Sequence, residues 1–308
     1  MPELPEVETI RRVVEPQIRG CAIENVLLQR PEIIAHPDAE TFCKQLQGQV
    51  FSGMARRGKY LIFSLEGGAR ILLHLRMTGC LLVAQAECPA EKHTHIVFCL
   101  NGGRQLRFSD VRRFGRLWLL QKGERDCYSG MEKLGLEPFD PGICAEYLLA
   151  RWGQRKRAIK ECLLEQNVVA GIGNIYSDEI LFAAKIHPAR PASALTQADW
   201  ERLAAAIPAC LRYFIEKNRI SPEEYWQTKG QDYRNTPFLR VYGRAGQACA
   251  KPATHRNRRQ KQRILPGLPG KNIKIQLGVS PLSAPSYPKI ARWARGFPAN
   301  GDGDRNAA

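Results

Sequence analysis

The hydrophobic pattern of this 308-residue chain changes twice, and these changes limit the folds that it can adopt. Over residues 3–18 the apolar residues recur at helical spacing, with Pro5 in the first turn, where proline is tolerated. Short strand-like runs follow, separated by turn signals such as Gly67-Gly68. We predict strands at 23–29, 50–56, 60–65, 70–75, 80–85, 94–100, 104–109 and 116–121. One helix followed by these strands predicts a β-sandwich or a flattened barrel.

From about residue 131 the pattern becomes helical. Pro138, Pro141 and Gly142 mark a linker. Predicted helices then occupy 145–152, 158–166, 177–185 and 197–218, and a strand-like run follows at 239–242. The chain is therefore expected to be an α+β protein, in which an N-terminal β-sandwich with a leading helix is followed by an all-α domain.

The last part of the sequence differs from the rest in composition. The final 60 residues contain seven prolines and six glycines, with few apolar clusters, which predicts a disordered tail. From Cys249 onward there are 12 Lys/Arg and 2 Asp/Glu, so this tail carries most of the net charge of +16. Excess positive charge favours a polyanion partner, although a basic solvated surface is the other interpretation. We place the domains at 1–130, 131–235 and 236–308.

Several protein classes are excluded by composition. No apolar stretch is long enough to span a membrane, so no membrane contact is expected. The start of the chain is acidic from Glu3 and lacks the basic and apolar regions of a secretory signal, so we expect a cytoplasmic protein. Ten scattered cysteines are present without any C-x-x-C pair, and in a cytoplasmic protein they are expected to be reduced thiols.

The N-terminus carries groups suited to nucleophilic chemistry. Removal of Met1 would leave Pro2 as a secondary amine, with a pKa of about 8 for such groups, and a nucleophile of this kind forms iminium intermediates. Glu3 and Glu6 lie close by in sequence and could serve as a general acid. The alternative is that Pro2 only precedes a helix whose N-terminus favours acidic residues.

Six short sequence motifs follow one another within the first 250 residues. They are Met-Pro-Glu-Leu-Pro-Glu-Val-Glu-Thr at 1–9, Arg-Gly-Lys-Tyr-Leu at 57–61, His-Leu-Arg-Met-Thr-Gly at 74–79, Lys-His-Thr-His at 92–95, Asp-Val-Arg-Arg-Phe-Gly at 110–115, and Val-Ala-Gly-Ile-Gly-Asn-Ile-Tyr at 169–176. Together they resemble the formamidopyrimidine-DNA glycosylases. Leu4 resembles that branch rather than the endonuclease VIII branch, which usually has glycine there.

The resemblance implies a catalytic role for three residues. Pro2 would be the Schiff-base nucleophile, Glu3 the acid that assists glycosidic cleavage, and Lys59 the lysine that serves β-elimination and contacts phosphate. It also implies that Met77, Arg112 and Phe114 enter the duplex and fill the gap left by an extruded base. Without the resemblance, Met77 and Phe114 would be interpreted as core residues.

The remaining site predictions concern DNA binding. His93 and Arg155 are expected to contact DNA, and His74 either does so or is a buried, satisfied histidine. The segment 171–174 resembles the turn of a helix–two-turns–helix motif, in which Asn174 donates to phosphate. Glu6 is grouped with these DNA-binding residues.

The implied activity is that of a bifunctional DNA glycosylase and AP lyase of base excision repair. It would excise 8-oxoguanine and formamidopyrimidines from duplex DNA and nick abasic sites by β(,δ)-elimination, as a monomer. The alternatives are a DNA-binding remnant, or an AP lyase that no longer excises bases. We expect residues 220–235 to form a loop, which in the family caps the extruded base. Its altered sequence leaves the base preference open.

The C-terminal part departs from the family pattern. The resemblance implies a four-cysteine zinc hairpin, but only Cys249 of the four ligands is present, Pro252 follows, and no later cysteine exists. One thiolate and His255 cannot complete a tetrahedral site, so no cofactor is expected. Arg263 and its neighbours are the candidates to replace the arginine of that hairpin. We hypothesise that the zinc hairpin is lost, or that the amino-acid sequence after Lys251 results from translation in the wrong reading frame. The gene sequence would decide between these explanations.

Overall fold

The computed structural model describes residues 2–230 and 235–245 of the chain. Its first part contains two α-helices and nine strands. In chain order these are α1 (Leu4–Ile18), β1 (Ile23–Leu28), β2 (Ile34–His36), α2 (Ala39–Leu46), β3 (Phe51–Arg57), β4 (Tyr60–Leu65), β5 (Arg70–His74), β6 (Gly79–Gln85), β7 (Thr94–Leu100), β8 (Arg104–Asp110) and β9 (Arg116–Leu120).

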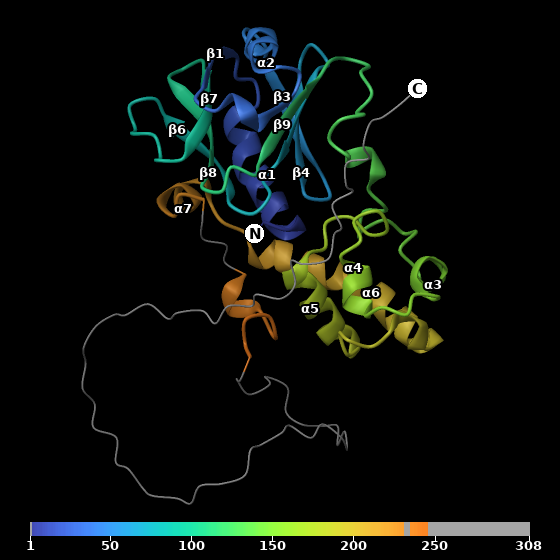
Figure 1. The fold of residues 1–308 in the computed structure, drawn as a ribbon. Coiled ribbons are helices and arrows are strands. Elements are labelled where there is room, and N and C mark those ends of the chain that lie inside the picture. The colour runs from blue at the N-terminus through green and yellow to red at the C-terminus, as the bar shows by residue number, and fades with distance from the viewer. Residues whose placement is uncertain (1, 231–234, 246–308) are drawn as a thin grey trace, which may run out of the picture. The chain divides into compact units, whose positions relative to one another are not determined.

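The strands form two sheets with α1 packed against both (Figure 1). The four-stranded sheet has the order β1-β7-β8-β6 and is antiparallel throughout. The five-stranded sheet has the order β2-β9-β5-β4-β3, and within it only β2 and β9 run parallel. The predicted β-sheet domain with a leading helix is therefore confirmed.

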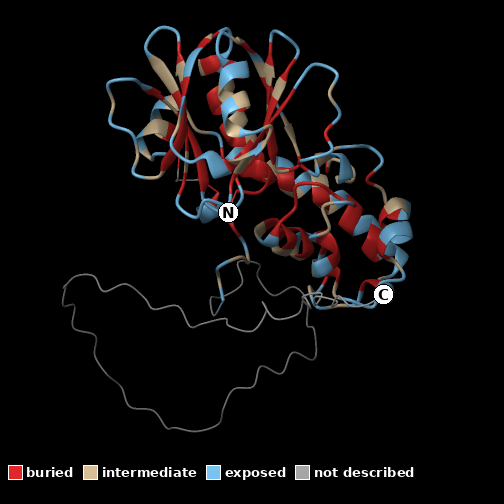
Figure 2. Ribbon diagram, turned by 45° about the horizontal axis from the view of Figure 1, so that its top comes forward, coloured by how far each residue is buried: buried red, intermediate tan, exposed pale blue. Residues whose placement is uncertain are grey.

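The two sheets and α1 share one hydrophobic core. Val7, Ile10 and Val14 are at most 1% exposed on α1, and they pack in one cluster with side chains of both sheets. Their spacing places them on one face of a 3.6-residue helix. Figure 2 shows the buried side of α1 in red between the strands. This packing fixes where α1 begins, and hence where Pro2 and Glu3 lie.

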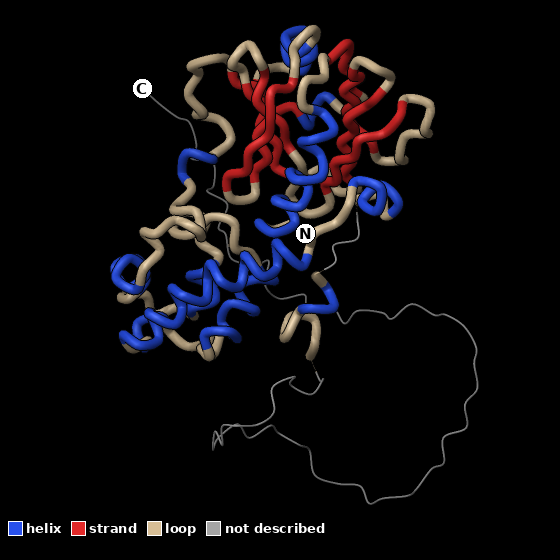
Figure 3. The backbone as a smooth tube through the Cα atoms, turned by 180° about the vertical axis from the view of Figure 1, so that it is seen from behind, coloured by secondary structure: helices blue, strands red, loops and turns tan. Residues whose placement is uncertain are grey.

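The second part is helical and has its own hydrophobic cluster. Its helices are α3 (Ala145–Trp152), α4 (Ile159–Leu163), α5 (Asn174–Ala184) and α6 (Gln197–Lys217). Figure 3 shows these helices gathered beside the N-terminal end of α1. The turn between α4 and α5 contains the predicted glycine motif, so the chain has the expected helix–two-turns–helix arrangement.

Two stretches differ from the sequence predictions. The strand predicted at 239–242 is wrong, because the amide groups of Arg240, Val241 and Tyr242 donate to the buried carboxylate of Glu179 rather than to a neighbouring strand. The segment 220–235 is not a continuous loop, since α7 (Pro222–Gln227) lies within it. Its first turn is closed by hydrogen bonds between Ser221 and Glu224.

The predictions for the C-terminal tail and its zinc hairpin fall on residues outside the described ranges. The domain boundary at 130/131 also stays a prediction; Met131 and Leu134, which lie just beyond it, pack in a third cluster with Tyr60, Leu72 and Trp118 of the β-sheet part. Among the helices that the structure describes, none combines the length and apolar character that crossing a membrane requires.

Candidate active site

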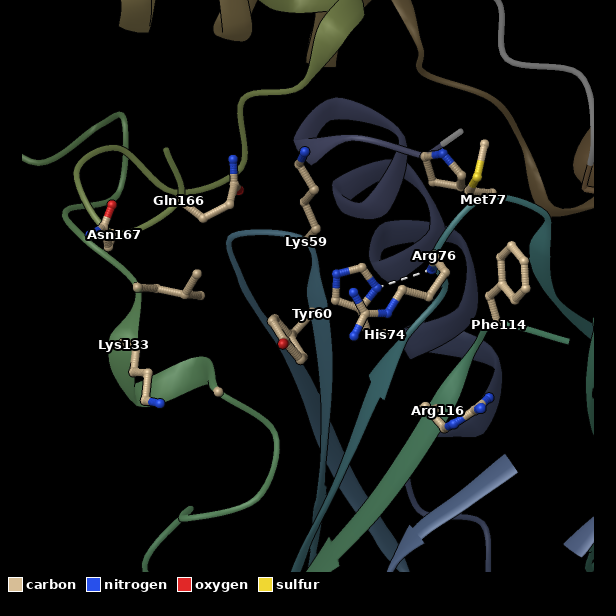
Figure 4. Close-up of a pocket in the computed structure, with 13 residues that line it drawn as sticks. Lys59, Tyr60, His74, Arg76, Met77, Phe114, Arg116, Lys133, Gln166 and Asn167 are labelled. Atoms are coloured by element: carbon tan, nitrogen blue, oxygen red, sulfur yellow. Dashed lines mark hydrogen bonds between the residues drawn. The ribbon is translucent and has the colours of Figure 1, made fainter. Parts of the chain in front are cut away.

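A cavity of about 770 Å³ lies where α1, the five-stranded sheet and the helical part meet. Pro2, Lys59, His74, Met77 and Phe114 all line it. Figure 4 shows Lys59, Tyr60 and His74 on one wall, Met77 and Phe114 at its edge, and Lys133, Gln166 and Asn167 on the other wall. The structure therefore brings together five of the residues that the sequence singled out.

Glu3 is fully buried and is held by the start of helix α5. Its carboxylate accepts hydrogen bonds from the amides of Gly173 at 2.8 Å, Ile175 at 2.9 Å and Tyr176 at 3.2 Å. These are the amide groups that a helix leaves unpaired in its first turn. Burial raises the pKa of Glu3, while Lys59 and the three amide donors oppose that shift. The pKa of Glu3 is thus shifted upward from that of an ordinary glutamate, the direction that suits a general acid.

Gly171 and Gly173 allow the N-terminal segment to lie close to the start of α5. Leu4 donates from its amide to the carbonyl of Gly171 at 3.2 Å, so the N-terminal segment runs directly along the glycine turn. A Cβ on Gly171 would lie 2.5 Å from a methyl carbon of Leu4, and φ at Gly171 is +91°. Gly173 faces Glu3 in the same way. The glycine motif thus allows close contact with the N-terminus of the same chain.

Lys59 lies in the turn between β3 and β4 and points toward the N-terminal end of α1 (Figure 4). Burial lowers its pKa, and the negative charges of Glu3 and Glu6 partly offset that shift. A lysine with a lowered pKa exchanges protons more readily near neutral pH. It is therefore placed to move a proton beside Pro2.

His74 is held as a neutral ring. Burial, together with the positive charges of Arg76 and Lys59, lowers its pKa to about 3. Its Nδ1 accepts a hydrogen bond from the amide of Arg76 at 3.0 Å, so the proton of the neutral ring is on Nε2. One ring nitrogen is therefore satisfied within the chain while the ring still lines the cavity, so the DNA contact of His74 stays a prediction.

The three residues expected to enter DNA are grouped at the cavity edge. Met77 is 41% exposed and Phe114 is 49% exposed, so the interpretation of either as a core residue is wrong. Nη1 of Arg112 lies 2.9 Å from Sδ of Met77, and its guanidinium lies 5.1 Å from the centre of the Phe114 ring. The three side chains therefore form one contiguous group.

The structure does not support a DNA contact for Glu6. This residue is 2% exposed, and its carboxylate accepts hydrogen bonds from the Glu3 amide, the Tyr176 hydroxyl, and the amides of Asn218 and Asn235. Burial raises its pKa from 4.5 to about 7. All of these contacts are internal. Glu6 is better described as a residue that fixes the position of Glu3.

The other predicted DNA contacts lie outside the cavity lining. Arg155 and Asn174 are exposed in the helical part, Asn174 as the first residue of α5. His93 is partly exposed in the turn before β7. Sequence reasoning did not single out the lining residues Tyr60, Arg76, Arg116, Lys133, Gln166 and Asn167. Arg76 could have been found, since it lies inside the motif at 74–79.

Among the described residues, no cluster of three or more His, Cys, Asp or Glu side chains could hold a metal ion. The family hairpin implies a zinc site, but the residues after Cys249 do not fit it, because the sequence supplies no further cysteine there.

The comparisons with known proteins agree with this architecture. A family model described as the formamidopyrimidine-DNA glycosylase N-terminal domain matches residues 1–117, and one described as the H2TH domain of the same glycosylase matches residues 134–224. A DNA glycosylase with an N-terminal β-sheet domain followed by a helix–two-turns–helix domain is the class of protein that the fold and these two models define.

Curated relatives and solved structures narrow the class to one family. The formamidopyrimidine-DNA glycosylase of Moorella thermoacetica is 46% identical over 251 residues, covering 82% of this chain and 92% of that protein. That of Geobacillus kaustophilus is 44% identical, covering 82% and 93%. The Lactococcus lactis Fpg bound to DNA containing an abasic site matches with a TM-score of 0.74 at 34% identity, covering 81% and 91%. The chain belongs to the formamidopyrimidine-DNA glycosylase family.

Proposed function

We propose that this chain excises oxidised purines from duplex DNA and then nicks the abasic site by β-elimination, with Pro2 as the nucleophile. The class of activity, a DNA glycosylase with AP-lyase activity in base excision repair, follows from the family. The observation that supports the residue roles is that Pro2 and Lys59 line one cavity, with the exposed pair Met77 and Phe114 at its edge.

The proposed chemistry begins once Met1 has been removed and the secondary amine of Pro2 is free. The nitrogen forms a bond to C1′ of the deoxyribose while the bond from C1′ to the base breaks, and the base leaves with a proton. Opening of the sugar ring gives an iminium at C1′. Loss of a proton from C2′ then expels the 3′ phosphate, which cuts the strand. Water finally hydrolyses the iminium and releases Pro2.

Glu3 and Lys59 would divide the proton transfers of this sequence. The raised pKa of Glu3 favours its acid form, which is suited to protonating the ring oxygen as the sugar opens. The lowered pKa of Lys59 brings its neutral amine within easier reach than in an ordinary lysine, and a neutral amine is suited to taking the C2′ proton. General acid–base catalysis of this kind contributes roughly 10²- to 10⁴-fold to a rate.

Double-stranded DNA is the proposed partner, bound by a single copy of the chain in the cytoplasm. His93, Arg155 and Asn174 would contact the backbone, while Met77, Arg112 and Phe114 would replace the extruded base. The L. lactis Fpg structures that match this chain contain DNA with an abasic site, an oxidised pyrimidine or Fapy-dG. We infer the same kind of substrate here, with oxidised purines preferred.

For the C-terminal part we propose that the zinc hairpin is lost, either naturally or through a change of reading frame. The support is the sequence alone, in which Cys249 is the last cysteine. Fewer phosphate contacts would lower duplex affinity and weaken δ-elimination. This favours a second candidate function, an AP lyase that cleaves abasic sites but has lost efficient base excision.

Borohydride trapping on a duplex with an 8-oxoguanine–cytosine pair tests the proposal. Wild-type protein, with loss of Met1 verified by mass, should form a covalent complex that a Pro2→Gly variant does not form. Release of free 8-oxoguanine separates the full glycosylase from the AP lyase, which would trap only on abasic DNA. A folded wild-type protein that traps on neither substrate at low salt would be a DNA-binding remnant, and the proposal would fail.

A further inference from the structure

Asp110 is a buried carboxylate at the end of β8 that ties two loops together. It is 1% exposed. Its Oδ1 accepts hydrogen bonds from the hydroxyl of Thr78 and from the amide of Arg112 at 3.1 Å, and its Oδ2 accepts one from the amide of Gly115 at 2.8 Å. Thr78 directly follows Met77. The carboxylate therefore joins the loop that carries Met77 to the loop that carries Arg112 and Phe114.

The main chain of Asp110 holds a third loop. Its amide donates to the carbonyl of His93 at 3.0 Å, and its carbonyl accepts from Nε2 of His95 at 2.7 Å. His93, which is expected to contact DNA, therefore lies on a loop attached to the same residue. One buried residue thus connects the three loops that carry Met77, His93, and Arg112 with Phe114.

Thr78 completes the connection between the first two loops. Its hydroxyl donates to Asp110 and accepts from the amide of Arg112 at 3.1 Å, so both hydrogen-bonding functions of the hydroxyl are used. Removing the hydroxyl while keeping the shape of the side chain would cut two links between these loops. The carboxylate of Asp110 would then accept hydrogen bonds only from the backbone amides of Arg112 and Gly115.

The loop after Asp110 has little freedom to adopt another conformation. Arg113 has φ of +58°, a left-handed conformation that is costly for a residue other than glycine. A Cβ on Gly115 would lie 2.5 Å from Cζ of Phe108 and 3.2 Å from Oδ2 of Asp110. A strained turn of this kind persists only when its surroundings fix it, and the carboxylate of Asp110 supplies that fixation.

We propose that Asp110 is a positioning residue that assembles Met77, Arg112 and Phe114 into one group before DNA binds, an inference that rests on the proposed function. Arg112 contacts both Met77 and Phe114, although 41% of Met77 and 49% of Phe114 is exposed, and the backbone amide of Arg112 is itself held by Asp110. Side chains that are already ordered lose less conformational entropy when they fill the gap left by an extruded base. Asp110 therefore acts on extrusion of the base rather than on bond cleavage.

The test compares two steps that depend differently on extrusion. Base excision from an 8-oxoguanine–cytosine duplex requires the base to leave the stack, whereas an abasic site has no base to extrude. With enzyme in excess, Thr78→Val should slow base excision by about 10- to 100-fold. Borohydride trapping on abasic DNA should change by less than about twofold. Thr78→Ser, which keeps the hydroxyl, should restore excision.

Thr94 on β7, the strand beside β8, offers a matched control. The hydroxyl of Thr94 is buried, and no hydrogen-bond partner is found for it among the described residues. Thr94→Val makes the same chemical change and should leave both rates unaltered. In Asp110→Asn, an NH2 group replaces one carboxylate oxygen, and this group cannot accept the hydrogen bonds that Thr78, Arg112 and Gly115 donate. This variant should therefore lose more base excision than Thr78→Val, again with little change in trapping. Thermal unfolding of each variant shows whether it is folded.

The outcomes separate this inference from the proposed function. Equal losses in excision and in trapping for folded Thr78→Val, or no loss in either, would overturn the positioning role of Asp110. A wild-type protein that does not trap on abasic DNA would instead refute the proposed function. Selective loss of excision, rescued by Thr78→Ser, would support Asp110 as the residue that positions the three side chains.

Discussion

The carboxylate of Glu3 lies directly against Gly173. The amide of Gly173 donates to Oε2 of Glu3 at 2.8 Å, and a Cβ on Gly173 would lie only 2.3 Å from Cδ of Glu3. Gly173 has an extended backbone, with φ of −131°, so its conformation does not require glycine. Space for the carboxylate is the reason that a side chain is excluded here.

Replacing Gly173 with alanine should therefore displace the Glu3 carboxylate. We expect a loss of about 1–3 kcal/mol in the free energy of unfolding, as for other overpacked sites, together with slower base excision. Urea unfolding and single-turnover excision would measure the two effects. Gly102→Ala is the control, because that turn glycine has open space around it; its positive φ costs stability, but excision should not change. Normal excision by Gly173→Ala would contradict the role of this contact.

The buried carboxyl of Glu6 should make stability depend on pH. Its pKa in the folded protein, about 7, lies above the ordinary value of 4.5, so the proton favours the folded state. This contribution is fully present below pH 4.5 and is lost as the pH rises through 7. The difference in unfolding free energy between wild type and Glu6→Gln should fall by about 3 kcal/mol over this range. A constant difference would show that Glu6 does not titrate in this way.

His74 should remain neutral at the pH at which the enzyme works. Its pKa of about 3 and the hydrogen bond from the Arg76 amide to Nδ1 predict the tautomer with a proton on Nε2. Imidazole ¹⁵N chemical shifts, assigned by comparison with His74→Gln, would report this directly. A doubly protonated His74 at about pH 6 would contradict the prediction. A neutral ring can donate to a phosphate without releasing a counterion.

Arg155 should contribute to DNA binding through its charge. A phosphate contact from this exposed side chain would add about 1 to the slope of log affinity against log salt. Arg155→Gln should therefore reduce that slope by about 1 when duplex binding is titrated at several salt concentrations. Arg30→Gln removes the same charge from an exposed position in the β-sheet domain, beside β1, and should leave the slope unchanged. Equal effects of the two substitutions would show that only net charge matters.

The sequence predicted the regular elements well wherever local pattern decides structure. All eight predicted strands are present, because their alternating or continuous apolar residues face the shared core. The short strand β2 and helix α2 were missed. β2 has only three residues, too few for a periodic signal, and its pairing with β9 is a contact between distant parts of the chain. Such pairing cannot be inferred from local pattern.

The site was predicted less completely, for a physical reason that Glu6 illustrates. Its neighbours in sequence suggest an exposed acid beside Pro2, but its partners Tyr176, Asn218 and Asn235 come from segments far along the chain. The same holds for 239–242, whose strand-like residues are bound by Glu179. Contacts of this kind depend on tertiary structure, and no local pattern contains them.

The contact between the Glu3 carboxylate and the start of α5 also makes the proposed activity sensitive to loss of the helical domain. A fragment that retained the whole β-sheet domain would still contain Pro2, Glu3 and Lys59, yet the Glu3 carboxylate would face water and behave as an ordinary surface acid. If Glu3 acts as proposed, bond cleavage would therefore depend on the helical domain as well. On the proposed roles, we expect a copy of the protein that lacks the helical domain to leave DNA uncut, because the start of α5 supplies the amides that hold Glu3 beside Pro2.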